Sequence, residues 1–304
     1  MAALKHHSKV YYDLHEKGHS NVDVAVALEV DEATVRRHLR KLKGSALSAV
    51  LTGRPEAVLD GFMDKPIHVS TEEGGWAITA DWHVPLVDYE YVAQFLDHAA
   101  ELGVRNLIIA GDWLHMDGLS SFDSKQSSAA LEIELPESSR LMRLVAERFD
   151  TIKYCYGNHD ARLQKSLGYQ LAFKDAMRLA FGDVGEDVLG KIEFSNLDHI
   201  LVNTPARTWR VCHPKAYNQQ PLATAIKLET IYRQAIITAH SHHAAMGYAK
   251  DGVTPVAEIG GLFDRGRTEY LQRTTTHPHW SQGYGLIDTD GRLVVESPGW
   301  SNRL

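Results

Sequence analysis

Aspartate, asparagine and histidine residues follow five short apolar runs of the sequence, each directly after its run ends. In chain order they are Asp81-Trp82-His83, Gly111-Asp112, Gly157-Asn158-His159-Asp160, His213 and His240-Ser241-His242. Carboxylate oxygen and imidazole nitrogen together suit a borderline first-row divalent metal. A single such residue after a strand is usually an ordinary polar residue. Five in order, each after its own run, predict a metal centre.

The apolar runs predict strands that alternate with helices. The strands leading into the five motifs are expected at 76–80, 106–110, 152–156, 208–212 and 235–239. Helices are expected at 89–102, 136–148, 168–181 and 221–232, and three further strands at 253–259, 284–288 and 292–296. Such alternation followed by a meander predicts an α/β sandwich with two sheets. Because ligands bind beyond the carboxyl ends of strands in α/β sheets, the motifs should converge there.

Residues 1–44 predict a small all-α domain, with helices at 4–17, from Ser20 onward, and from Asp31 to 43. Ser20 and Asp23 form a capping-box pattern, and Asp31 can cap the third helix. The string VAVALEVDEATVRRHLRKL resembles a helix-turn-helix. That resemblance implies DNA contact through the third helix, at Thr34, Arg36, Arg37, Arg40 and Lys41. Glu29 occupies the turn position where glycine is common, and a helical cap or a dimerisation element is the alternative.

Glycine and proline residues punctuate positions 45–75, which predicts a linker before a main domain at 76–304. Charge differs between the parts: residues 1–45 carry 8 Lys and Arg against 6 Asp and Glu, and the remainder carries 24 against 33. The chain has neither an apolar run of membrane-spanning length nor a signal-peptide pattern at its start. We therefore expect a cytoplasmic protein with no membrane partner, and the sequence leaves a homo-oligomer open.

The ordered set of motifs resembles the signature of the calcineurin-like metallophosphoesterases over about residues 76–296. The resemblance implies a four-layer αββα sandwich around two divalent metals. By matching motif, the first metal would be held by Asp81, His83, Asp112 and His242, and the second by Asp112, Asn158, His213 and His240. Asp112 would then bridge the two metals. Manganese is the expected metal, and iron and zinc also suit these ligands.

The resemblance further implies that His159 remains free of metal and stabilises or protonates the leaving oxygen. Asp160, its neighbour in sequence, could orient and charge that imidazole. Arg162 could donate a forked pair of hydrogen bonds to phosphate, or it could be a surface arginine at the start of a helix. His115, Asp117 and the late segment 277–280 are further residues that could approach or cover the site.

Two departures from the signature leave the ligands intact: Cys212 and Ala239 stand where glycine is usual. The second motif reads GDWLHMDG and lacks the extension typical of protein phosphatases, which disfavours protein dephosphorylation. The leading hypothesis is a two-metal phosphodiesterase, a nuclease acting on DNA. The alternatives are a phosphatase or diesterase for nucleotides and other small phosphate esters, and a DNA-binding regulator whose phosphoesterase domain senses a ligand.

Overall fold

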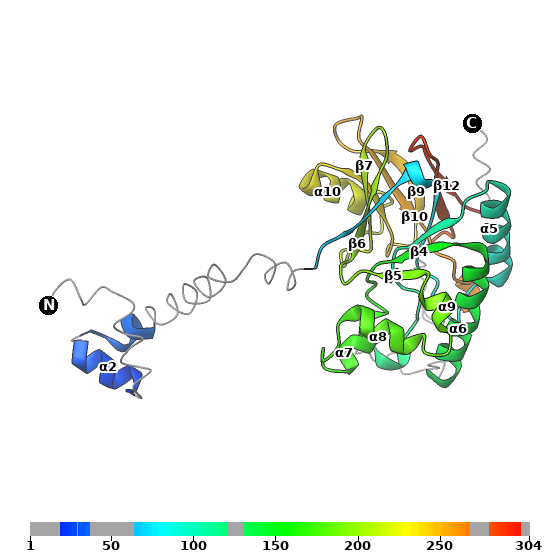
Figure 1. Ribbon diagram of the computed structural model, residues 1–304. Coiled ribbons are helices and arrows are strands. Elements are labelled where there is room, and N and C mark those ends of the chain that lie inside the picture. Colours follow the sequence, from blue (N-terminus) through cyan, green and yellow to red (C-terminus); the bar gives the residue numbers. More distant parts are fainter. Residues whose placement is uncertain (1–18, 29, 37–63, 121–130, 268–279, 299–304) are drawn as a thin grey trace. The chain divides into compact units, whose positions relative to one another are not determined.

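The computed structural model describes residues 19–28, 30–36, 64–120, 131–267 and 280–298 (Figure 1). The chain divides into two compact units, Met1–Asp64 and Lys65–Leu304. Among the described residues, none of the helices combines the length and apolarity that a bilayer crossing requires.

The smaller unit contains helix α2 (Asn21–Leu28) and a second helical stretch at residues 32–36. The expected capping box before α2 is present: Asp23 Oδ2 accepts the Ser20 N–H at 2.9 Å, and Ser20 Oγ accepts the Asp23 N–H at 3.2 Å. Asp31 caps the next helix by accepting the Thr34 N–H at 2.7 Å. Three buried residues, Val24, Ala25 and Val35, form the small core between the two helical stretches. The predicted helix at 4–17 and residues 37–43 lie outside the described residues.

The larger unit contains two six-stranded sheets. Sheet A has the order β1 (Ile67–Ser70), β6 (His199–Asn203), β7 (Thr208–Cys212), β8 (Ala235–Thr238), β10 (Pro255–Ile259) and β9 (Ala244–Tyr248). Sheet B has the order β12 (Leu293–Glu296), β11 (Tyr284–Ile287), β2 (Trp76–Thr79), β3 (Asn106–Ile109), β4 (Thr151–Tyr154) and β5 (Ile192–Phe194). Strands β2 to β5 run parallel to one another, and so do β7, β8 and β10.

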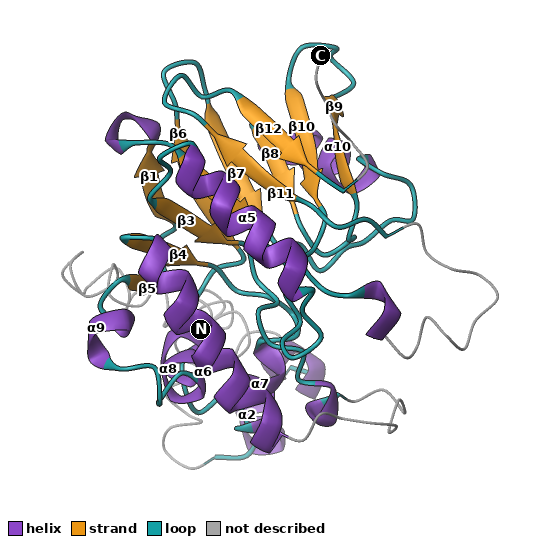
Figure 2. Ribbon diagram, turned by 90° about the vertical axis from the view of Figure 1, so that its right-hand side faces the viewer, coloured by secondary structure: helices purple, strands orange, loops and turns teal. Residues whose placement is uncertain are grey.

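The helices of this unit are α5 (Tyr89–Glu101), α6 (Leu131–Arg148), α7 (Ala161–Ser166), α8 (Phe173–Ala180), α9 (Glu186–Leu189) and α10 (Ala223–Tyr232). Short 3₁₀ turns are η2 (Thr71–Glu73), η3 (Asp117–Leu119) and η4 (Arg265–Arg267). Figure 2 shows α5 and α6 in front of the strands. The Asp88 side chain caps α5 by accepting the Tyr91 N–H at 3.1 Å, which fixes where that helix begins.

Three apolar clusters separate four layers. Alternate side chains of one strand enter different clusters: Leu107 and Ile109 of β3 pack against α5, α6 and α8, whereas Ile108 packs between the two sheets. A third cluster joins sheet A to α10 through Ile236, Val256 and Ala225. Central strands covered on both faces are buried throughout, as β2 and β8 are, and each of these is apolar except for its last residue, Thr79 or Thr238. The predicted four-layer αββα sandwich is therefore confirmed.

The structure differs from the sequence prediction at several elements. Strand β1 lies inside the predicted linker 45–75 and pairs with β6, so the larger unit begins before residue 76. Four strands were not predicted: β1, β5, β6 and β9. Strand β1 buries only Val69 and so carries no alternating pattern. The helix predicted at 168–181 is α8 alone, starting at Phe173, and α6 begins at Leu131, five residues earlier than predicted.

Candidate metal centre

The five motifs meet at one edge of the sandwich because the strands that lead into them are neighbours. Strands β2, β3 and β4 are adjacent and parallel in sheet B, and β7 and β8 are adjacent and parallel in sheet A. Backbone bonds continue this pairing beyond the strand ends: Asp81 N–H donates to the Gly111 carbonyl at 3.2 Å, and Trp82 N–H to the Asp112 carbonyl at 2.9 Å. The loops are thus held in register directly where their polar side chains begin.

The backbone at the motifs is left-handed. Of the nine non-glycine residues with positive φ among those described, five are predicted ligands: Asp81, His83, Asp112, His240 and His242, with φ between 48° and 74°. Such conformations cost about 1–3 kcal/mol each in residues with a side chain and persist only where the surrounding structure holds them. Five such residues lie at one edge of the sandwich. The backbone strain there is tolerated because it orients the side chains of the predicted ligands.

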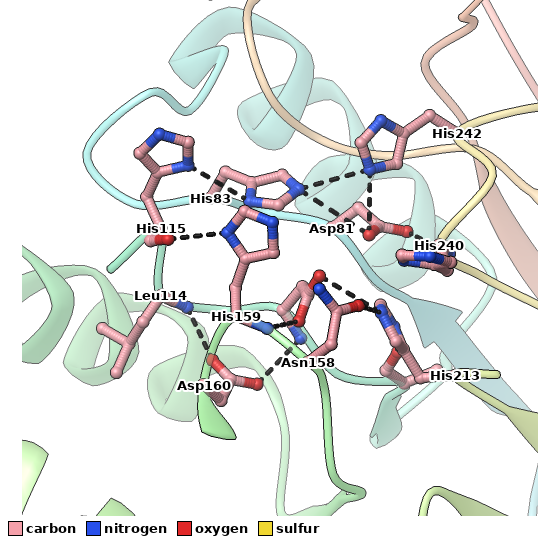
Figure 3. Close-up of polar contacts among 12 residues, drawn as sticks. Asp81, His83, Leu114, His115, Asn158, His159, Asp160, His213, His240 and His242 are labelled. Carbon is pink, nitrogen blue, oxygen red and sulfur yellow. Dashed lines mark hydrogen bonds and ion pairs between the residues drawn. The ribbon is translucent and has the colours of Figure 1, made fainter. Parts of the chain in front are cut away.

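Asp81, His83 and His242 form the first group of ligand-type atoms (Figure 3). His242 Nε2 lies 3.1 Å from Asp81 Oδ1 and 3.3 Å from His83 Nε2, and His83 Nε2 lies 3.7 Å from the same carboxylate oxygen. The other oxygen of Asp81 accepts the backbone N–H of His240 at 3.0 Å. One carboxylate oxygen and two imidazole nitrogens therefore face a common point.

Asp112, His213 and His240 form the second group, and Asn158 joins it. His213 Nε2 lies 3.1 Å from Asp112 Oδ2 and 2.9 Å from Asn158 Oδ1. Asp112 Oδ1 accepts the N–H of His159 at 2.7 Å, which leaves Oδ2 to face the group. All seven predicted ligands thus lie in one of the two groups.

A cation fits the second group on chemical grounds. His213 Nδ1 donates to the Ala110 carbonyl at 2.8 Å, so a neutral His213 ring presents only a lone pair at Nε2. That lone pair faces two oxygens, and Asp112 Oδ2 is buried with no well-aligned hydrogen bond. Burial opposes a charge on His213, but the Asp112 carboxylate outweighs it and raises the pKa of His213 to about 10. A proton or a metal ion is needed where these three acceptors converge.

Two of the other ligand imidazoles, those of His83 and His240, are held in the neutral form, which is the form that binds a metal. Burial, together with His159 and His242, holds the pKa of His83 well below its usual value. Burial and the adjacent His213 lower the pKa of His240 to about 4. The site therefore combines two buried carboxylates with imidazole nitrogen donors, a set that suits first-row divalent ions.

His159 lies beside the first group and outside both ligand sets. Its ring lies 4.5 Å from that of His83, and its Nδ1 donates to the His115 carbonyl at 2.6 Å. Burial lowers the pKa of His159 to about 4, so the free ring is neutral at pH 7. Arg162 Nη2 donates to His159 Nε2 at 3.3 Å, and Arg162 Nη1 pairs with Asp117 at 3.3 Å. Arg162 is therefore at the site and bound to protein acceptors; its contact with phosphate stays a prediction.

The role predicted for Asp160 needs correction. Its carboxylate does not point at the His159 ring but accepts the backbone N–H groups of Asp112 at 2.8 Å and Leu114 at 2.9 Å. Peptide N–H groups of the neighbouring loop are the donors within reach of this fully buried side chain. Asp160 therefore fixes the loop that carries Asp112, and the His115 carbonyl orients His159 instead.

Aromatic rings flank the first group, and the sequence did not single out all of them. Phe263 lies 4.7 Å from the His242 ring and 5.4 Å from the His83 ring, and Trp280 lies 4.5 Å from His242. Nothing in the sequence near Phe263 marks it, because it reaches the site from a loop after β10. Trp280 belongs to the late segment expected to approach the site, of which residues 277–279 lie outside the described residues.

The predicted DNA-contacting residues belong to the smaller unit. Thr34 Oγ1 donates to Asp31 at 2.9 Å, so it serves the helix cap. Arg36 is exposed and pairs with Glu32 four residues earlier at 2.6 Å. Arg37, Arg40 and Lys41 lie outside the described residues. DNA contact by this helix stays a prediction.

Gly157 is the position where a single methyl group should damage the centre. A Cβ there would lie 2.1 Å from the Asp112 nitrogen and 2.4 Å from Asp112 Oδ1. We expect Gly157→Ala to weaken Mn²⁺ binding at least about tenfold in calorimetric titration, since overpacking costs about 1–3 kcal/mol. Gly182→Ala, whose Cβ meets only the Leu179 carbonyl at 3.3 Å, is the matched control. Equal Mn²⁺ affinity in both variants would contradict the assignment.

Glu134 of α6 should make stability depend on pH. Burial raises its pKa to about 7, while Oε1 accepts the Met116 N–H at 2.7 Å. The folded state then holds a proton that the unfolded state releases, so the free energy of unfolding falls as pH rises from about 4.5 to about 7. Glu134→Gln should flatten this dependence by up to about 3 kcal/mol in urea unfolding at pH 5 and 8. Glu132→Gln, an exposed position on the same helix, should leave the pH dependence of the free energy of unfolding unchanged. The same pH dependence in Glu134→Gln as in the wild type would refute the prediction.

Comparison with known proteins yields matches in structure alone: no family model and no curated protein matches the chain. Vacuolar Protein Sorting 29 from Cryptosporidium parvum is 11% identical, with TM-score 0.39, covering 74% of this chain and 96% of its own. The nuclease MPE of Pseudomonas putida is 15% identical, with TM-score 0.31 and coverage of 73% and 87%. The calcineurin-like phosphoesterase YfkN of Bacillus subtilis is 12% identical, with TM-score 0.34 and coverage of 74% and 90%.

At these identities and TM-scores, no property of those proteins is carried over to this chain. The fold rests on the chain's own features, which are two six-stranded sheets between helical layers and five ligand motifs at one edge. The larger unit is thus a four-layer αββα sandwich that carries the five motifs, in their predicted order, at one edge.

Proposed function

We propose that the larger unit is a dinuclear-metal-dependent phosphoesterase, and that its substrate is a phosphodiester of DNA. The observation that supports the proposal most is the meeting of two ligand groups, Asp81–His83–His242 and Asp112–His213–His240, with Asn158 joining the second. Two divalent cations bound there would polarise a phosphate and lower the pKa of water for an in-line attack. Among candidate functions, hydrolysis of a phosphate ester uses every one of these side chains.

The chain's own residues supply orientation and charge. Asp112 accepts the His159 N–H and so fixes the start of the loop that carries His159. The His115 carbonyl holds Nδ1–H of His159, which leaves Nε2 as the atom directed at an incoming group. Arg162 already contacts that Nε2, so a phosphate arriving here meets a guanidinium at the same place. An anion would thus meet the Arg162 guanidinium here, and assistance to its leaving oxygen would require His159 to take up a proton at Nε2, because the neutral ring carries its proton on Nδ1.

DNA is proposed as the substrate because of the smaller unit. Its described part is a pair of capped helices around a core of Val24, Ala25 and Val35. The basic sequence RRHLRKLK begins at Arg36, the last described residue of the second helix. A protein that binds DNA mainly through phosphates needs such a cluster of cations, and the larger unit carries an excess of acidic residues. The smaller unit would therefore supply the affinity and the larger unit the chemistry.

Asp112→Asn is the direct test of the phosphoesterase. The amide retains an oxygen that accepts the His159 N–H but removes the charge facing His213, so we expect Mn²⁺-dependent cleavage of DNA to fall at least about 10²-fold. The exposed Glu101→Gln should retain wild-type turnover. Cleavage that persists in Asp112→Asn would show that the activity arises elsewhere. DNA binding without hydrolysis of any ester by the wild type would favour the ligand-sensing regulator.

Removal of residues 1–44 tests the DNA assignment, and it leaves the unit that begins at Lys65 whole. We expect a gel-shift assay at low salt to show at least about tenfold weaker binding of duplex DNA, together with a shallower salt dependence, because phosphate contacts are lost. Turnover of a small phosphodiester should stay at the full-length level. Unchanged DNA affinity would remove the main support for a DNA substrate.

A small phosphate ester is the second candidate substrate, and the charge of the chain favours it. Residues 46–304 carry 24 basic and 33 acidic residues, which disfavours a long polyanion on the larger unit. Turnover of mononucleotides or cyclic nucleotides alone, with intact DNA left uncut, would place this candidate first. The helices of the smaller unit would then serve assembly.

A further inference from the structure

We propose that the loop following His213 is the substrate-recognition loop, and that Tyr217 stacks on an unpaired nucleobase beside the phosphate to be cleaved. This inference rests on the proposed phosphodiesterase function and narrows its substrate. The loop runs from the ligand His213 to helix α10, and residues 215–220 are all exposed. The loop therefore begins at a buried ligand and continues along the surface of the protein.

The position of Tyr217 is the observation that carries the proposal. Its ring lies 6.4 Å from the ring of His240, a member of the second ligand group, at an interplanar angle of 86°. The side chain is nevertheless 56% exposed. A large ring that meets a ligand imidazole edge-to-face and stays open to water offers a platform for a planar group next to the metal centre.

Trp280 and Phe263 provide the contrast. The Trp280 ring contacts both His242 at 4.5 Å and Phe263 at 5.5 Å, and Phe263 is fully buried. These two rings are engaged in packing around the first ligand group. They stabilise the position of His242, whereas Tyr217 at the second group keeps most of its surface exposed.

The other side chains of the loop suit a nucleotide chain. Lys215 is exposed two residues before Tyr217 and can meet a backbone phosphate, and Asn218, Gln219 and Gln220 follow. Asn218 Oδ1 accepts the Gln220 N–H at 2.8 Å, so the segment after Tyr217 turns back on itself. Cation, exposed aromatic ring and amides in one short segment are the combination that single-strand binding uses.

The stacking requirement selects unpaired nucleotides. Inside a duplex both faces of a base are covered by its neighbours, so a protein ring cannot stack on it without unstacking cost. A single strand or a frayed end presents a free face, and every base has one, so no sequence preference is expected. The substrate class inferred is therefore DNA with an unpaired base next to the scissile phosphate.

The test compares two oligomers of equal length with full-length protein and Mn²⁺: oligothymidylate, and the same backbone built from tetrahydrofuran abasic residues. For oligothymidylate we expect Tyr217→Ala to raise KM about 5- to 140-fold, the range equivalent to 1–3 kcal/mol per stacked base. For the abasic oligomer the increase should be at least about five times smaller, because the ring has no base to stack on. Tyr217→Phe should retain most of the wild-type affinity, since stacking does not use the hydroxyl.

Tyr248→Ala is the matched control. Tyr248 is 64% exposed and lies four residues along β9 from Ala244, about 13 Å from that end of the strand. It should behave as wild type on both oligomers. An equal rise in KM on both oligomers, or no rise on either, would overturn the stacking proposal while leaving the phosphodiesterase intact. Cleavage of duplex DNA but of neither oligomer would overturn this inference alone, and cleavage of no DNA at all would refute the proposed function and this inference with it.

Discussion

The buried carboxylate of Asp112 is the group around which the centre is organised. Its oxygens face the His159 N–H and His213 Nε2, its own N–H donates to Asp160, and its carbonyl accepts the Trp82 N–H. Burial opposes the charge, but His213 and His159 outweigh it and hold the pKa of Asp112 well below its usual value. An ionised carboxylate without contact to water needs hydrogen-bond donors or cations beside it. The His159 N–H and the His213 ring occupy these positions at Asp112.

That constraint extends into the backbone. Gly111 and Gly157 lie so close together that a Cβ on Gly111 would come within 2.7 Å of the Gly157 Cα. The two loops can approach only because neither residue carries a side chain. Asp81, His83 and Asp112 have left-handed backbone, and their side chains belong to the two ligand groups. The two packed sheets hold these strained loops, because their first residues continue the strand pairing.

The two units divide the proposed work by charge. The larger unit is acidic in composition, so the proposed metal ions would supply the positive field at its centre, whereas residues 1–45 are net basic. Long-range attraction to a polyanion acts between exposed charges and is weakened by salt. Stabilisation of one phosphate at a buried site is screened much less. The exposed loop after His213 adds a third contribution, recognition of the group attached to that phosphate.

Sequence alone predicted the fold class, because each ligand follows an apolar run and the runs recur with helices between them. It also predicted which side chains meet, from Asp81 to His242, since parallel strands end at the same edge. Local patterns were sufficient for the Ser20–Asp23 cap as well. They were insufficient for short strands such as β1, whose four residues bury one side chain and whose pairing partner lies more than a hundred residues away.

The sequence by itself determined the kind, number and order of the candidate ligands, because these depend on residue type and on position after a strand. Only the tertiary structure decided what surrounds them. Asp160 serves the Asp112 loop and not its sequence neighbour His159, and Arg162 meets Asp117 across 45 residues. Phe263 and Tyr217 reach the ligand imidazoles from loops that no local pattern marks. Such contacts join residues distant in the chain, and three-dimensional packing sets which donors and rings come within reach.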